Sequence, residues 1–264
     1  MKPKNLKGAA PKDTYGAIDG NGNTVDPSHT IFPIIKHNNE GLIRLIGTGF
    51  FIAENGIFVT AKHVLLDVLD EKGIQTDAIS LVQLLGGSYL IRPILRCTSH
   101  EIADISVGIA APTTNDKTGE PLKNKLLKLT PKLGELGARV CTYAYPKSVI
   151  KHEEKQELHF YPEYYEGNTE TYYPDGRDKV LLPGPCLQTS MHIHGGASGG
   201  PVFTEAGIVC GVNSTGYEND SLSFITPIET IENLMLSDVN TPNNSTGQIR
   251  INELIKDKFI TYET

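Results

Sequence analysis

One short segment of this sequence combines a nucleophile with an unusual density of glycine. Ser198 lies within Gly195-Gly196-Ala197-Ser198-Gly199-Gly200-Pro201. Glycine loses more backbone entropy on folding than any other residue, so such a cluster needs a structural reason. A hairpin turn is one reason. The other is a turn that aims backbone N–H groups at one point, as stabilisation of a developing oxyanion requires.

A nucleophilic serine also needs a base to accept its proton and a group that orients this base. His63 lies in Thr60-Ala61-Lys62-His63, where we expect a strand to give way to a helical turn. Asp104 opens the apolar stretch Asp104-Ile105-Ser106-Val107, and a buried carboxylate needs hydrogen-bonding partners. Taken singly, His63 also fits a capping or core histidine. Asp104 alone also fits a turn residue that bonds its own backbone.

Composition sets the class of protein in which these residues act. The 264 residues are 39% hydrophobic and 21% charged, which is typical of a soluble globular protein with one large or two small domains. The net charge is −7 and no basic block is present, which argues against nucleic-acid binding. No window of 18 residues is apolar throughout, so we expect no membrane span.

The first 30 residues and the cysteines bear on location. Residues 1–30 contain no apolar h-region, so we expect no Sec-type signal peptide and a cytoplasmic protein. The four cysteines (Cys97, Cys141, Cys186 and Cys210) are widely spaced and are expected to be reduced and mostly buried. A disulfide is the alternative if the chain is exported.

Two stretches resemble part of a metal site, but each lacks residues that such a site requires. Asp19 to Asn23 alternates oxygen ligands like the start of a calcium loop, but Thr24 stands where that loop needs glycine and Thr30 is not acidic. Asn21-Gly22 is more simply a tight turn. His192 and His194 have the spacing of two ligands on one strand face, yet no third ligand is evident. We therefore expect neither a metal nor a cofactor.

Short apolar stretches separated by glycine-containing turns predict an all-β architecture. Six strands are expected between residues 31 and 110, with helical turns at 61–69 and a hairpin about Gly86-Gly87. A second set of about six strands is expected from 138 to 226. Two such sets predict two β-barrels side by side.

Three finer expectations concern the second half. Residues 156–173 are expected to form a long hairpin that turns at Gly167-Asn168. Residues 228–236 have an amphipathic helical pattern, and 249–260 fit a short terminal helix. Composition divides the chain into a polar N-terminal arm (1–28), a first barrel carrying His63 and Asp104 (29–112), an inter-barrel linker (113–135), a second barrel carrying Ser198 plus a helix (136–236) and a C-terminal extension (237–264).

Together the motifs carry a resemblance that single residues do not. Thr60-Ala61-Lys62-His63 is similar to the T-A-x-H signature of trypsin-like serine proteases, and Gly196-Ala197-Ser198-Gly199-Gly200-Pro201 to their G-x-S-G-G-P. Asp104-Ile105-Ser106-Val107 resembles the family's aspartate motif. The order His, Asp, Ser is that of chymotrypsin. Gly47-Thr48-Gly49-Phe50 is similar to the strand before the histidine in bacterial HtrA-like members. The resemblance covers roughly residues 30–236.

The resemblance implies a chymotrypsin-like fold of two six-stranded antiparallel β-barrels with a C-terminal helix. It implies a serine endopeptidase acting on a protein or peptide through an acyl-enzyme, with His63, Asp104 and Ser198 as the triad. The oxyanion hole would be formed by the N–H groups of Gly196 and Ser198. Two alternatives stay open: a catalytically silent peptide-binding module, and a protease that an activating protein partner must order.

The sequence also departs from the digestive members of the family. Ala197 stands where they carry an aspartate, and no Ile-Val-Gly-Gly precedes the first barrel, so we expect no zymogen activation by that route. We also expect no PDZ domain. His192 stands where trypsin carries an aspartate, so an acidic or amide P1 side chain is favoured over a basic one. The expected pocket residues are His192, Asn213, Ser214, Thr215, Gly216 and Ser223.

Overall fold

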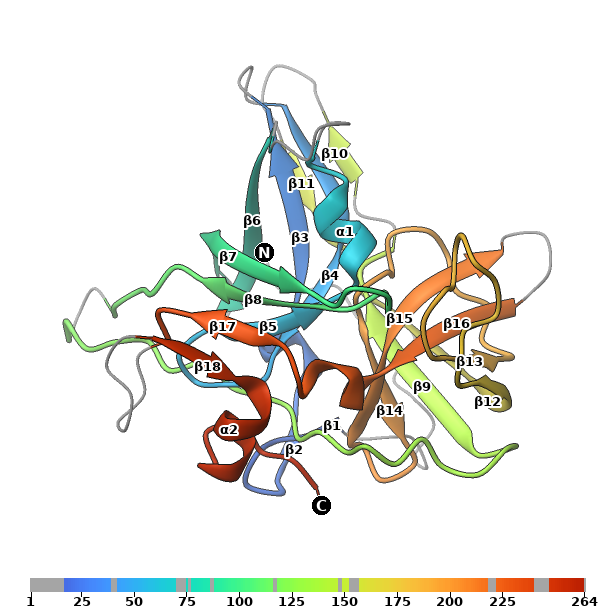
Figure 1. Ribbon diagram of the computed structural model, residues 1–264. Helices are drawn as coiled ribbons and strands as arrows, with labels where there is room; N and C mark the ends of the chain where they lie inside the picture. Colours follow the sequence, from blue (N-terminus) through green and yellow to red (C-terminus); the bar gives the residue numbers. More distant parts are fainter. Residues whose placement is uncertain are drawn as a thin grey trace.

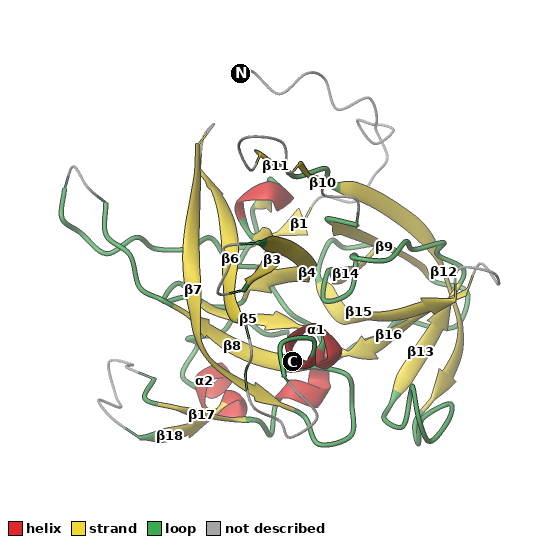
Figure 2. Cartoon of the chain, turned by 90° about the horizontal axis from the view of Figure 1, so that it is seen from above, coloured by secondary structure: helices red, strands yellow, loops and turns green. Residues whose placement is uncertain are grey.

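The computed structural model places two closed six-stranded β-barrels side by side (Figure 1). Figure 2 shows the same arrangement from above, with the short helix α1 (Lys62–Leu66) between the barrels. The expected all-β, two-barrel fold is thereby confirmed. The structure describes residues 17–38, 42–69, 75, 77–85, 88–115, 118–146, 149–151, 157–217, 222–239 and 247–263.

Within each barrel the neighbouring strands pair antiparallel. The first barrel has the strand order β3 (Ile31–His37), β4 (Ile43–Phe51), β5 (Ile57–Thr60), β8 (Ser106–Ala110), β7 (Ser88–Ser99) and β6 (Ala78–Leu85). The second has the order β12 (Glu163–Tyr173), β13 (Cys186–Thr189), β16 (Leu222–Pro227), β15 (Val209–Tyr217), β14 (Pro201–Thr204) and β9 (Arg139–Ala144).

The β6–β7 hairpin expected around Gly86-Gly87 is present. Leu85 pairs with Ser88 at its closed end, while the two glycines lie outside the described residues. A smaller hairpin joins β10 (Val149–Lys151) to β11 (Glu157–His159).

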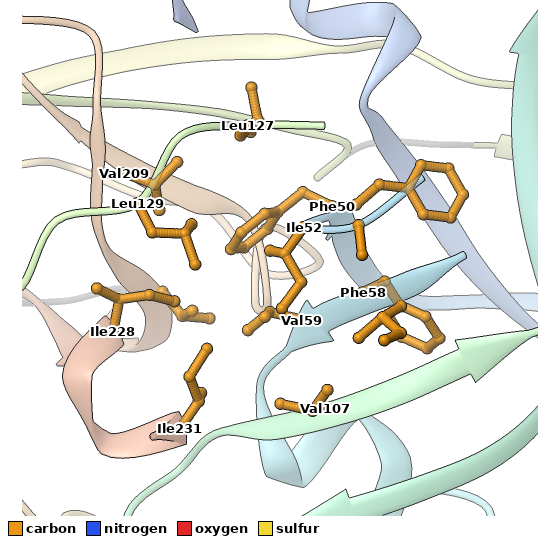
Figure 3. Close-up of a cluster of buried hydrophobic side chains, with 14 of the residues drawn as sticks. Phe50, Ile52, Phe58, Val59, Val107, Leu127, Leu129, Val209, Ile228 and Ile231 are labelled. Carbon is orange, nitrogen blue, oxygen red and sulfur yellow. The ribbon is translucent and has the colours of Figure 1, made fainter. Parts of the chain in front are cut away.

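Apolar packing continues from one barrel to the other. Phe58 and Val59 of β5 belong to one cluster of buried side chains with Leu127 and Leu129, which lie in the segment between the barrels, and with Val209 of β15 (Figure 3). All five side chains are buried. Burying a side chain of this size contributes about 1.5–3 kcal/mol, so the connecting segment is itself part of the core.

Hydrogen bonds from Thr48 of β4 join the two barrels at the glycine-rich segment. Its N–H donates to the Ser198 carbonyl at 2.8 Å. Its hydroxyl accepts from the Tyr145 N–H at 3.1 Å and donates to the Gly196 carbonyl at 3.3 Å. Its carbonyl accepts from the Thr60 hydroxyl at 2.7 Å. The bond from Thr60 lies within the first barrel and the other three cross to the second, so every polar group of Thr48 is hydrogen-bonded.

Glycine at position 199 is what lets the second barrel approach Thr48. Gly199 has a φ of +86°, and a Cβ there would lie 2.1 Å from the Thr48 carbonyl oxygen and 2.2 Å from Thr60 Oγ1. Gly137 has nearly the same φ, +87°, but open space around it. A side chain at either position would meet the same backbone strain, but only at position 199 would it also be crowded.

Two finer expectations of the sequence analysis are wrong. Residues 167 and 168 do not turn, because β12 runs straight through them. Gly167 instead allows a close approach, since a Cβ there would lie 2.6 Å from the Met191 nitrogen. The β10–β11 hairpin and β12 are thus separate elements, and no single hairpin turns at 167–168.

The helix expected at 228–236 is also absent. Ile228–Ile231 forms one 3₁₀ turn, η2, and Met235–Ser237 is strand β17. The buried Ile228 and Ile231 fit a helical spacing, but Leu234 and Leu236 alternate as in a strand. β17 pairs with β18 (Gln248–Arg250), and this pairing decides the conformation.

The segments at the two ends of the chain pack onto the connecting segment. Residues 17–29 form the β1 (Ala17–Ile18) and β2 (Thr24–Val25) hairpin and the 3₁₀ turn η1 (Pro27–His29), while residues 1–16 lie outside the described residues. The expected terminal helix is α2 (Ile251–Lys256). After it, Glu263 N donates to the Leu129 carbonyl at 2.7 Å. Among the described residues, no helix is long and apolar enough to cross a bilayer.

We predict that Gly199→Ala destabilises the protein more than Gly137→Ala. Both substitutions force alanine to a positive φ, at a cost of about 1–2 kcal/mol. Crowding against Thr48 and Thr60 should add about 1–3 kcal/mol at position 199 alone. Urea unfolding of the two variants measures the difference, and equal losses would contradict the role given to the close approach.

Candidate active site

Strand pairing brings His63 and Asp104 together. Thr60 at the end of β5 pairs with Ser106 at the start of β8. His63 follows Thr60 by three residues, and Asp104 precedes Ser106 by two. The two segments therefore leave the barrel at the same end. The His63 N–H donates to Asp104 Oδ1 at 2.9 Å, which anchors the first turn of α1 to the carboxylate.

The side chains of His63 and Asp104 are also hydrogen-bonded, Nδ1 to Oδ2 at 2.8 Å. Burial raises the pKa of the Asp104 carboxyl, but the hydrogen bonds and charge of His63 and the Ser214 hydroxyl outweigh it, so the pKa lies below its ordinary value. An ionised carboxylate only accepts hydrogen bonds. The proton therefore sits on His63 Nδ1, which leaves Nε2 of the neutral ring as a base.

Ser214 of β15 has a role that the sequence analysis did not assign. Its hydroxyl donates a short hydrogen bond to Asp104 Oδ2, so the carboxylate is held from both barrels. The side chain of Asp104 is 15% exposed, while that of His63 is 47% exposed. The Asp104 carboxylate is thus enclosed, whereas the His63 ring is open to a ligand.

His100 positions the segment that carries Asp104, and the sequence analysis missed it. Its Nδ1 accepts from the N–H groups of Ile102 at 3.1 Å and Ala103 at 2.9 Å. Burial and then the charge of Lys62 lower the pKa of His100, which favours the neutral ring that such acceptance requires. The sequence signal that could have identified this positioning residue is a histidine four residues before Asp104.

The glycine-rich turn places Ser198 beside this pair of residues. Asn213 fixes the turn on the side of β15, because its carbonyl accepts from Gly199 N at 2.8 Å and its N–H donates to the Gly200 carbonyl at 2.9 Å. On the other side, a Cβ on Gly47 would lie 2.6 Å from Val64 of α1 and 2.9 Å from the Ser198 carbonyl oxygen. Glycine at 47 therefore lets α1 and the Ser198 turn close on one another.

Two backbone N–H groups in this turn are free for a ligand. Gly196 N and Ser198 N donate to no acceptor in the described part of the chain. Their neighbours are fixed: Ala197 N donates to the His194 carbonyl at 3.3 Å, and Gly200 N donates to the Ala197 carbonyl at 3.0 Å. Gly196 has a φ of +94°, and a Cβ there would lie 2.7 Å from the Pro146 carbonyl oxygen.

The Ser198 hydroxyl donates to the Ser214 carbonyl at 3.3 Å. Within the described residues it makes no hydrogen bond to His63. Catalytic hydrogen bonds in ligand-free enzymes are commonly long or misaligned and tighten when substrate binds. A rotation about the Ser198 side chain is therefore the step that would complete the arrangement.

Three adjoining depressions form a groove across these residues. The first, of about 630 Å³, is lined by Gly195, Gly196 and Pro146. The second, of about 140 Å³, contains Ser198 and shares Gly195 with the first. The third, of about 450 Å³, contains His63 and shares Thr215 with the second. An extended peptide could therefore lie across all three.

The third depression is apolar on its outer side. Leu66, Ile102, Val180 and Leu181 line it, and all four are exposed. Val180 is 84% exposed, although valine is usually buried. Exposed apolar side chains gathered beside a candidate site indicate a surface that contacts a ligand.

The small pocket beside Ser198 contains only part of the set expected from the sequence. Asn213, Ser214 and Thr215 line it. His192 is exposed and His194 lines the pocket in its place, because the chain leaves the sheet after β13 and turns Met191 inward. Further lining residues that the sequence analysis missed are Ile193 and Phe224.

The two remaining expected pocket residues lie in the sheet. Ser223 is buried and its hydroxyl is hydrogen-bonded to Thr189 Oγ1 at 2.8 Å, so its side chain serves the barrel and does not line the pocket. Gly216 belongs to β15 and pairs with Ser223.

Comparison with known families now gives a decisive match. Residues 47–212 match the model of the trypsin-like peptidase domain. The chain belongs to the trypsin-like peptidase family. This span contains His63, Asp104 and Ser198 and most of both barrels.

Solved structures agree at the level of the fold. The chain is similar to Deg5, with a TM-score of 0.54 and 18% identity over 77% of this chain and 86% of that one. It is also similar to the active form of the Rv3671c protease from M. tuberculosis, with a TM-score of 0.53 and 15% identity over 77% and 78% of the two chains. No curated protein sequence matches it.

The structure also places the cysteines and the residues that were considered as metal ligands. The four cysteines are free thiols, with Cys97 exposed and the other three buried. Among the described residues, no group of three or more His, Cys, Asp or Glu side chains could hold a metal ion. At Asp19, where a calcium loop was considered, Oδ1 accepts from the N–H groups of Asn21 and Asn23, as in a tight turn.

We predict that Asp104→Asn lowers stability in a pH-dependent way. Because folding depresses the pKa of Asp104, the ionised carboxylate stabilises the wild type fully above the unfolded-state value of about 3.9. That contribution is lost as the pH falls through the lower folded-state pKa. The difference in unfolding free energy between wild type and variant should therefore be largest at neutral pH and shrink below about pH 4. Urea unfolding from pH 3 to 7 measures it, and a difference independent of pH would contradict this view of the site.

Proposed function

We propose that this protein is a serine endopeptidase that uses His63, Asp104 and Ser198 as a catalytic triad. The observation that carries the proposal is the doubly held carboxylate of Asp104, which fixes the proton on His63 Nδ1 and leaves Nε2 available as a base. A core or capping histidine needs no such arrangement. Family membership supports the same function.

The proposed mechanism assigns each group one task. Ser198 Oγ attacks a peptide carbonyl carbon while His63 Nε2 accepts the hydroxyl proton, and the resulting imidazolium is stabilised by Asp104. The free N–H groups of Gly196 and Ser198 receive the negative charge that develops on the carbonyl oxygen.

When the tetrahedral intermediate collapses, the carbon–nitrogen bond breaks and His63 returns the proton to the leaving amine. An acyl-enzyme on Ser198 remains, and water hydrolyses it by the same steps.

We predict that Ser198→Ala abolishes covalent labelling by a fluorophosphonate and lowers peptide turnover by about 10⁶-fold. The nucleophilic oxygen is absent from this variant, while the fold should be retained. The matched control is Ser88→Ala, which removes an exposed hydroxyl at the start of β7. Mass spectrometry should place the label on Ser198 in the wild type and in the control. Turnover by Ser198→Ala at the wild-type rate would refute the assignment.

One observation favours a second candidate, a protease that a partner must activate. The Ser198 hydroxyl is engaged by the Ser214 carbonyl and not by His63. A ligand that displaces this bond would complete the triad. Under this alternative the isolated, folded protein would not label with the fluorophosphonate, and labelling would appear on adding a substrate-like peptide or the partner.

A further inference from the structure

Two exposed apolar side chains lie at the tip of a loop, residues 177–182, that hydrogen bonds hold in shape. Val180 is 84% exposed and Leu181 is 58% exposed. Asp178 Oδ1 accepts from the N–H groups of residues 180, 181 and 182 at 2.9, 2.6 and 3.3 Å. Arg177 N donates to the Leu182 carbonyl at 2.9 Å and closes the loop. The exposure of the two side chains therefore belongs to a structured loop.

This 177–182 loop is anchored to both barrels. Leu182 is buried in a cluster of the second barrel. Gly184 touches the turn of the first barrel that carries Asp104, because a Cβ at 184 would lie 2.6 Å from Ala103 Cα. The tip of the loop is thereby kept beside the third depression of the groove, the one that contains His63.

The first barrel contributes two further apolar side chains to this depression. Leu66 lies in α1 and Ile102 in the turn before Asp104, and both are exposed and line the volume of about 450 Å³. The only ammonium group among its described lining residues, that of Lys62, donates to the Glu101 carbonyl at 2.8 Å. Apolar surface is thus presented from both barrels next to the proposed base, and burying it against a ligand is favourable.

The free edge of β15 indicates which part of a substrate reaches this depression. β14 pairs with β15 only as far as Val212, and beyond Asn213 no strand covers that edge in the described part of the chain. An extended peptide can add to such an edge. The acyl portion has to stay bound after the amine has left, so it belongs on this edge. Thr215 of the edge lines both the depression with Ser198 and the one with His63.

We propose that the 177–182 loop, together with Leu66 and Ile102, forms an apolar P2 pocket beside His63, and that the enzyme prefers a large aliphatic residue at P2. This inference rests on the serine endopeptidase function proposed above. The P1 side chain occupies the small pocket beside Ser198, and the residue before it reaches the next depression along β15.

The same surface discriminates between P2 side chains. A leucine buries its own apolar surface and that of the pocket walls. A glycine leaves these walls in contact with water. A lysine loses hydration without gaining a counter-charge, since Asp104 is enclosed and already bonded to His63 and Ser214.

The test uses fluorogenic peptide amides that release a coumarin when the bond after P1 is cleaved, so the register is fixed. P1 is an equal mixture of amino acids, P3 is glycine, and P2 is Leu, Ala, Gly or Lys. We expect kcat/KM to be about 10- to 100-fold higher with Leu than with Gly at P2, and Lys to be no better than Gly. Leucine moved to P3, with glycine at P2, should give no such gain, because successive side chains of an extended chain point to opposite faces.

A charged variant and a matched control separate specificity from general damage. Leu181→Asp changes an exposed side chain, so the fold should be retained. It should reduce the Leu-to-Gly ratio by about 3- to 10-fold, and should raise cleavage of the Lys substrate above the wild-type level, a gain that misfolding cannot produce. The control, Leu136→Asp, makes the same change at a leucine that is 66% exposed and lines none of the three depressions. It should keep the wild-type ratio.

Fluorophosphonate labelling distinguishes the two levels of failure. A wild-type protein that labels on Ser198 but shows no preference for leucine at P2 overturns the specificity inference and leaves the endopeptidase function standing. A folded protein that neither labels nor cleaves, with or without substrate-like peptide, overturns both. A leucine preference that Leu181→Asp leaves unchanged overturns the assignment to the loop.

A second copy of this chain is the competing occupant of the apolar surface. Sedimentation velocity measures it on the same three proteins. A dimer formed by the wild type and by Leu136→Asp, but not by Leu181→Asp, would assign the surface to self-association and overturn the P2 pocket. Monomers throughout, with the expected P2 preference, support the pocket.

Discussion

The site depends on the set of hydrogen bonds that Thr48 makes across the barrel interface. Each barrel supplies part of the chemistry: β5, α1 and the turn before β8 carry His63 and Asp104, whereas the turn before β14 carries Ser198. Nothing in either barrel alone fixes the distance between these groups. Thr48 N–H and the Ser198 carbonyl join them directly at 2.8 Å. Because both groups are shielded from water, breaking this bond would leave two buried polar groups unpaired. The interface is therefore held where the chemistry needs it.

This constraint explains where glycine is required and where it is not. Gly47 and Gly199 lie at the points where the barrels touch, and side chains there would meet Val64, the Ser198 carbonyl or Thr48. Gly196 faces Pro146 in the same way. The glycine cluster is thus a set of close approaches combined with a turn. In the same turn the N–H groups of Gly196 and Ser198 have no acceptor among the described residues, while the carbonyls of these two residues accept from Thr48 of the other barrel.

How far the sequence could predict the structure depended on whether a feature was local. Two barrels, the β6–β7 hairpin and the short terminal helix followed from patterns of a few consecutive residues. Gly167 was read as a turn because a turn and a close approach to Met191 ask for the same residue. The 228–236 segment was read as helical because its strand partner, β18, lies elsewhere in the chain.

In the site, the motif residues were predictable by type and spacing. The exchange of His192 for His194 was not, since it depends on which way the chain turns after leaving β13.

In Asn213 the backbone and the side chain have different tasks. Its backbone N–H and carbonyl hold Gly200 and Gly199, the two residues that follow Ser198. Its side-chain Nδ2 donates to Thr142 Oγ1, which fixes the amide against β9. The same division holds for Ser214, whose carbonyl contacts the Ser198 hydroxyl and whose hydroxyl contacts Asp104. Two successive residues of β15 thus connect the Ser198 turn with the carboxylate of Asp104 through a single strand.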